Sequence, residues 1–242
     1  MEKKTTRPDC VKNKQACDYS AGRLAEAAAG PSLYWRTRAY NELALRAFKQ
    51  LGALPVSIEL HAIKAEILSN HGQHLEAAAE WRAAQKFAPA DPGLQNQLAM
   101  SLYEGADYST AVPLLEGLLR NEPKSAELNF FLGDSFLRME QPDKALPLLE
   151  AAVKYDAKLL PARASLGLAY IRLTRDADAI PHLTAAREID DDGSIHFQLA
   201  QAYRRAGNDE ASKQMLAEYT RIQKRSKTEE RNLEEEAAIT AP

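Results

Sequence analysis

The segments AVPLL (111–115), ALPLL (145–149) and AIPHL (179–183) share the pattern Ala-x-Pro-x-Leu and recur every 34 residues. A unit of this length is too short to bury its own apolar face, so it must stack on its neighbours. The spacing therefore predicts a stack of repeated units with a long concave surface, and not a globule around an enclosed active site.

The same register extends beyond these three copies. Ala77 precedes Ala111 by 34 residues, with Trp81 in the position of the later leucines, and Ala211 follows Ala179 after 32 residues with Met215 four positions on. The alignment therefore predicts five units, of which the last has shortened connections.

Each unit also carries a second apolar pattern ahead of its alanine, in which a large residue, a small residue and a further large residue define one helix face. The copies are Lys64, Ala65 and Leu68; Leu98, Ala99 and Leu102; Leu132, Gly133 and Phe136; Leu166, Gly167 and Tyr170; and Leu199, Ala200 and Tyr203. A second helix follows, and we expect Pro113, Pro147 and Pro181 to lie in its first turn, because proline is tolerated there. Each unit is thus predicted to be a helix, a tight turn and a helix.

These residues resemble the tetratricopeptide repeat, whose order is Trp, Leu-Gly, Tyr, Ala, Phe and a closing Pro over 34 residues. The fourth unit matches this order best, through Leu166, Gly167, Tyr170, Ala179 and Leu183. The chain departs from this order at three positions. Lys64 replaces the leucine in the first unit, and Ala157 and Asp191 replace the closing proline in two units. The position of the tryptophan is held by His61, Gln95, Asn129, Arg163 and His196. The resemblance implies an all-α, right-handed α-solenoid over residues 58–224.

The rest of the chain is less regular. Residues 1–30 are expected to be a leader, disordered over 1–17 with a short helix over 21–29. Residues 31–57 are predicted to hold one long degenerate helix, which caps the solenoid or is the remnant of further repeats. Residues 225–242 form a charged C-terminal helix or tail, interpreted as solvated or as a docking segment for a basic partner.

Composition and charge argue against several classes of function. The 31 basic residues and 34 acidic residues give a net charge of −3, which does not favour nucleic-acid binding. No apolar stretch is long enough to span a membrane and no signal peptide is recognised, so the chain as written is expected to be cytoplasmic, or exported if it is a fragment. Cys10 and Cys17 match no common zinc spacing; inert thiols are expected, and a local disulfide stays open for an oxidising compartment.

The sequence contains none of the common catalytic or phosphate-binding motifs, so an enzyme is not expected. Residues 188–193 place acidic groups before Gly193 as a calcium loop does, but Leu199 stands where the bidentate Glu is needed. We therefore expect these acids to cap the next helix, and we expect neither a metal nor a cofactor.

The candidate site is the concave groove. In a tetratricopeptide-like stack the first helix of each pair lines this side, and helical spacing sorts the residues that face it. The predicted partner-binding residues are Asn96, Met100 and Tyr103; Phe130, Asp134 and Arg138; Leu168 and Arg172; and Phe197, Gln201, Arg204 and Arg205.

This set describes an apolar groove with a basic end. Phe130, Leu168 and Phe197 would bind apolar anchors of a peptide or helix, and the arginines would pair with carboxylates of an acidic partner. Alternatively, the aromatic residues contact neighbouring helices or the C-terminal segment. Family members that bind chaperone tails use a Lys and Asn clamp, but the corresponding residues here are Ala62, Glu66, Gln97, Glu127 and Phe131. An adaptor of that type is not expected.

The sequence thus predicts a non-enzymatic protein-interaction module that binds a peptide or helix of a partner. One alternative is the docking or regulatory portion of a larger polypeptide whose catalytic part lies elsewhere. Self-association through the end repeats is a third possibility. Fold class alone does not identify the partner.

Overall fold

A computed structural model describes residues 10–51 and 55–237, which form thirteen α-helices and one short 3₁₀ helix and, within these ranges, no strand. The chain divides into two compact units, one made of Met1–Pro55 with Glu230–Pro242 and the other of Val56–Glu229. None of the described helices has both the length and the apolar character of a membrane span.

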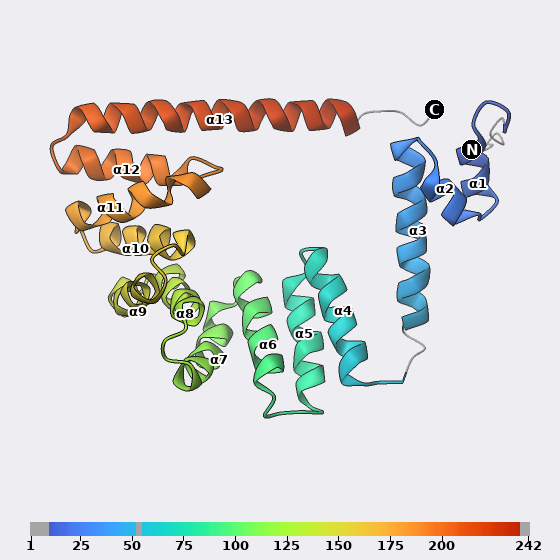
Figure 1. Ribbon diagram of the computed structural model, residues 1–242, viewed down its shortest axis with the longest axis horizontal. Helices are drawn as coiled ribbons and strands as arrows, with labels where there is room; N and C mark the ends of the chain where they lie inside the picture. The colour runs from blue at the N-terminus through green and yellow to red at the C-terminus, as the bar shows by residue number, and fades with distance from the viewer. Residues whose placement is uncertain (1–9, 52–54, 238–242) are drawn as a thin grey trace, which may run out of the picture. The chain divides into compact units, whose positions relative to one another are not determined.

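The larger unit is a curved stack of helix pairs (Figure 1). The first helices of the pairs are α4 (Ile58–Asn70), α6 (Pro92–Glu104), α8 (Ala126–Arg138), α10 (Leu160–Arg172) and α12 (Ser194–Arg205). The second helices are α5 (His74–Gln85), α7 (Tyr108–Asn121), α9 (Pro142–Tyr155), α11 (Asp176–Ala186) and α13 (Asp209–Ala237). From α4 to α12 each helix contacts the next. The predicted all-α solenoid is confirmed, and α13 continues through residues 225–237, within the region predicted to be a charged C-terminal helix or tail.

The repeated small and large residues form the core of the stack. Ala111, Ala145 and Ala179 have no exposed surface, and Leu149 and Leu183 are at most 1% exposed. Because alanine projects only a methyl group, the paired helices approach closely and the leucines fill the space between them. Apolar residues of all five helix pairs belong to one continuous core cluster.

The prediction for the three prolines is wrong. Helices α7, α9 and α11 begin five residues before these prolines, so Pro113, Pro147 and Pro181 are each the sixth helical residue. A proline there leaves one carbonyl of the first turn without its helical hydrogen bond. Those carbonyls belong to exposed residues, Ser109, Asp143 and Ala177, where water can replace the lost donor.

The turn within each helix pair has one residue with positive φ. The five residues are Gly72, Ala106, Glu140, Thr174 and Gly207, with φ of 72°, 59°, 57°, 58° and 80°. Only glycine adopts this region without a steric penalty, and a β-branched residue is the least suited to it. Thr174 is therefore the most strained member of this repeated turn.

Replacement of Thr174 by Gly is expected to raise the free energy of unfolding by about 1 kcal/mol, because the strain exceeds the chain entropy that glycine adds. Chemical denaturation followed by circular dichroism measures the change. The matched control is Thr174→Ala, which keeps a Cβ atom at positive φ and should gain less than half as much. A Thr174→Gly protein no more stable than the parent would contradict the assignment of strain.

The smaller unit contains α1 (Lys14–Ser20), α2 (Leu24–Ala29) and α3 (Leu33–Leu51). Helix α1 was not expected, because residues 14–17 were predicted to be disordered; residues 1–9 lie outside the described residues. A disulfide joins Cys10 and Cys17, so the expectation of inert thiols is wrong. The buried amide of Gln15 holds the helices together, since it donates to the Ala27 carbonyl and accepts from the Ser32 N–H.

The acidic segment before α12 caps that helix, as predicted. Asp190 accepts hydrogen bonds from the backbone N–H groups of Ile195 and His196, at 3.1 and 2.9 Å. Its carboxylate also contacts Nδ1 of His196, which was predicted to pack edge-on between helices. His61 likewise makes a polar contact, 2.6 Å from Glu80. Both histidines thus have a carboxylate partner, and the centroid of the His61 ring also lies 6.0 Å from that of Phe87.

Candidate interaction groove

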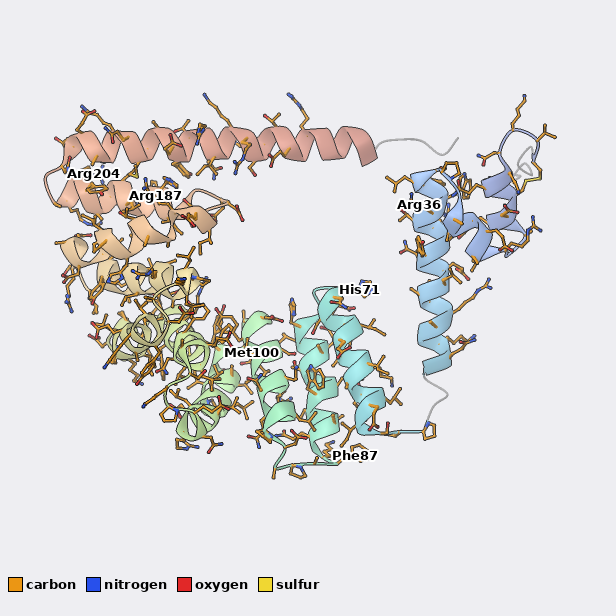
Figure 2. The ribbon with its side chains drawn as sticks, in the orientation of Figure 1. Arg36, His71, Phe87, Met100, Arg187 and Arg204 are labelled. Carbon is orange, nitrogen blue, oxygen red and sulfur yellow. A yellow bond between two sulfur atoms is a disulfide. The ribbon has the colours of Figure 1, made fainter. Side chains whose placement is uncertain are left out.

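Two neighbouring hollows lie along the first helices of the first four units, α4, α6, α8 and α10. Met100 of α6 lines both of them, and Figure 2 labels it on the helix between α5 and α7. Because Met100 lines both hollows, they adjoin at α6 and together form one groove. Asn96, Met100 and Phe130, three of the predicted residues, line it.

The larger hollow has a volume of about 660 Å³ and an apolar floor. It lies among α6, α8 and the start of α10, with Phe130, Phe131 and Pro161 in its lining. The two phenylalanine rings lie 4.9 Å apart, and Phe131 makes an edge contact with Tyr103 at the same distance. An aromatic and proline floor of this kind suits an apolar side chain of a ligand.

The smaller hollow, of about 430 Å³, is polar. It lies between α4 and α6, and its lining comprises Glu66, Ser69, Asn70, Trp81, Gln97, Met100, Ser101 and Glu104. The repeat resemblance did not identify Ser69, Asn70 or Gln97 as binding residues. Ser69 and Asn70 lie 34 positions before Tyr103 and Glu104, so the same register could have identified these two.

Asp134 was predicted to contact the ligand, but it is buried, with 2% exposure. The Tyr103 hydroxyl donates to its Oδ2 at 2.8 Å, and the Ser165 hydroxyl donates to its Oδ1 at 2.6 Å. Arg138 Nε also donates to Oδ2, at 3.2 Å. Asp134 on α8 therefore ties together α6 and α10, and the role of Ser165 was missed because serine carries no repeat signature.

Burial and the Asp134 carboxylate together set the ionisation of these groups. Burial, followed by the nearby Asp134 charge, raises the pKa of the Tyr103 phenol. The same carboxylate raises the pKa of the Arg138 guanidinium. Tyr103 is thus a neutral donor at physiological pH and Arg138 is a cation, and both are committed to Asp134.

The arginines at the predicted basic end have partners within the chain. Arg172 donates to Glu140 at 2.7 Å, and Arg205 contacts both oxygens of Asp176 at 2.6 to 2.9 Å. Each pair joins the end of a first helix to the preceding unit. Arg204 is exposed, and among the described residues it makes no ion pair.

The other predicted residues lie outside the two hollows. Leu168 packs against the core cluster, and Gln201 is half-buried beside Arg205. Phe197 is 39% exposed, with its ring 5.4 Å from that of Tyr219 on α13. The alternative in which an aromatic residue contacts a neighbouring helix therefore holds for Phe197.

Comparison with known proteins agrees with the repeat geometry. The family model of the tetratricopeptide repeat matches residues 96–138 and 132–194. No curated protein is similar enough in sequence to match.

Solved structures share the fold at low sequence identity. MamA 41-end from Desulfovibrio magneticus RS-1 is 21% identical, with a TM-score of 0.61 over 69% of this chain and 95% of that one. YrrB, described as a TPR protein with an unusual peptide-binding site, is 22% identical, with a TM-score of 0.55 over 68% of this chain and 85% of that one. The thermophilic TPR protein TTC0263 of Thermus thermophilus is 19% identical, with a TM-score of 0.53 over 69% and 91% of the two chains.

Proposed function

We propose, from the premise that this chain is a tetratricopeptide repeat protein, that it is a non-enzymatic scaffold and that its groove binds a peptide or helix of a partner protein. The observation that carries the proposal is the pair of hollows that share Met100. Folding of the stack does not require a hollow with an aromatic floor. Binding of an apolar side chain of a ligand does require such a hollow.

The geometry favours an anchor in the larger hollow. Its rim is formed by residues of three consecutive units, so a ligand lying across it would contact α6, α8 and α10 at once. Proteins commonly bind peptides by burying a few apolar side chains in such a groove while the rest of the interface stays polar. YrrB, which shares the fold, is described as a TPR protein with an unusual peptide-binding site, and this supports a peptide as the class of ligand.

A blocking substitution tests the proposal. Asn96 is exposed and lines the larger hollow, so Asn96→Trp should fill the hollow without disturbing the core. Short random peptides displayed on phage are selected on the immobilised full chain, and the bound peptides are measured by fluorescence anisotropy. We expect Asn96→Trp to weaken their binding roughly tenfold or more, because the anchor loses its site.

The matched control is Asn41→Trp, the same substitution at an exposed position of α3. It should leave the affinity within about twofold, since it adds an aromatic surface without filling the groove. A selection that returns no binding peptide, or peptides that bind both variants equally, would overturn the proposed function.

A further inference from the structure

Three of the arginines that were predicted to line the groove pair with carboxylates of the chain itself. Arg138 pairs with Asp134, Arg172 with Glu140, and Arg205 with Asp176. An acidic ligand would meet a carboxylate of the chain beside each of these arginines, and repulsion by that charge would oppose its binding. Three of the four cations that suggested an acidic partner are thus already neutralised.

The two hollows present the opposite charge. Glu66 and Glu104 line the smaller hollow, and Glu122 and Glu127 line the larger one, whereas neither lining contains a lysine or arginine. Glu66, Glu122 and Glu127 are exposed, and no ion pair with a described residue involves them. Glu104 is 47% exposed, with Nδ1 of His74 at 3.0 Å.

The smaller hollow has the composition of a site for a cationic side chain. Carboxylates only accept hydrogen bonds, and the amide oxygens of Asn70 and Gln97 can add further acceptors to those of Glu66 and Glu104. An ammonium or guanidinium group, by contrast, only donates. Because the hollow is concave, a bound cation there would be partly desolvated and would interact more strongly than on an open surface.

The two hollows are neighbours, since Met100 belongs to both. The geometry points to a ligand segment that carries an apolar or aromatic residue beside a lysine or arginine, bound as part of a partner protein. This inference rests on the proposed function and specifies its ligand: the apolar residue occupies the aromatic floor at Phe130 and Phe131, and the basic residue occupies the site at Glu66 and Glu104.

Charge reversal in the smaller hollow tests the inference. Peptides selected on the full chain should be enriched in Lys or Arg close to an apolar residue. The double variant Glu66→Lys with Glu104→Lys should weaken their binding roughly tenfold or more, because it replaces two attractive pairs by repulsive ones. The conservative double variant Glu66→Gln with Glu104→Gln should give a smaller loss in the same direction. Thermal melts followed by circular dichroism establish that each variant is folded.

The matched control reverses the basic end, by Arg172→Glu with Arg205→Glu. It should change the affinity of the basic peptides by less than about twofold, since these arginines lie outside both hollows. Affinity for the parent should also fall as salt is added, as expected for a ligand held by opposite charge.

The other outcomes separate the inference from the proposed function. If Asn96→Trp abolishes binding but the selected peptides are neutral or acidic, or bind the Glu66 and Glu104 variants unchanged, the groove binds peptides and the charge assignment is wrong. If Asn96→Trp has no effect, both fail. If sedimentation shows that the parent self-associates through this groove and the double lysine variant does not, the occupant is a second copy of the chain and the partner assignment is overturned.

Discussion

Replacement of Asp134 by Ala is expected to lower the free energy of unfolding by about 3 kcal/mol, because it removes a buried hydrogen-bonded charge. The substitution would leave the Tyr103 hydroxyl and the Ser165 hydroxyl without the acceptor that joins them, at 2.8 and 2.6 Å. The loss falls on contacts between three consecutive units, so the central repeats should unfold at lower denaturant. Urea denaturation followed by circular dichroism measures the change.

The matched control for this change is Asp143→Ala, at an exposed position of α9. A surface aspartate of this kind should alter stability by no more than about 0.5 kcal/mol. Tyr103→Phe gives a second comparison, since it removes one donor and leaves the carboxylate with Ser165 and Arg138. Equal stability of Asp134→Ala and Asp143→Ala would show that the hydrogen-bonded cluster does not hold the units together.

Replacement of Gly167 by Val is expected to destabilise the protein by about 3 kcal/mol through overpacking. A Cβ atom built on Gly167 lies 2.5 Å from Cγ of Leu183, far inside van der Waals contact. Leu183 is 1% exposed and has no free space to enter, so α10 and α11 must separate. The thermal midpoint measured by calorimetry should fall accordingly.

Gly117 provides the control at another helical glycine. A Cβ atom there meets only the end of the Arg120 side chain, at 3.6 Å. Gly117→Val should therefore be neutral or slightly stabilising, because valine has the higher helix propensity. If both valine variants had the same stability, the close approach at Gly167 would not explain the small residue in this position of the repeat.

The residues that line the hollows were harder to predict than the fold. Helical spacing predicted that Asn96, Met100 and Phe130 face the groove, and all three line the larger hollow. The same spacing placed Asp134 in the groove, where it is instead buried by residues 31 positions away on either side. A side chain's face on its own helix is a local property, but its exposure also depends on the units stacked above and below.

The sequence by itself determined the repeat, its 34-residue period and the all-α solenoid. The physical reason is that each unit must bury its apolar face against its neighbours, so the apolar residues recur in the same register. Only the tertiary structure decided which charges are free to bind. Arg172 and Arg205 pair with Glu140 and Asp176, residues 32 and 29 positions earlier. Pairing of this kind depends on how two units meet and leaves no periodic signal, so the charge of the groove emerged only when the helices were in place.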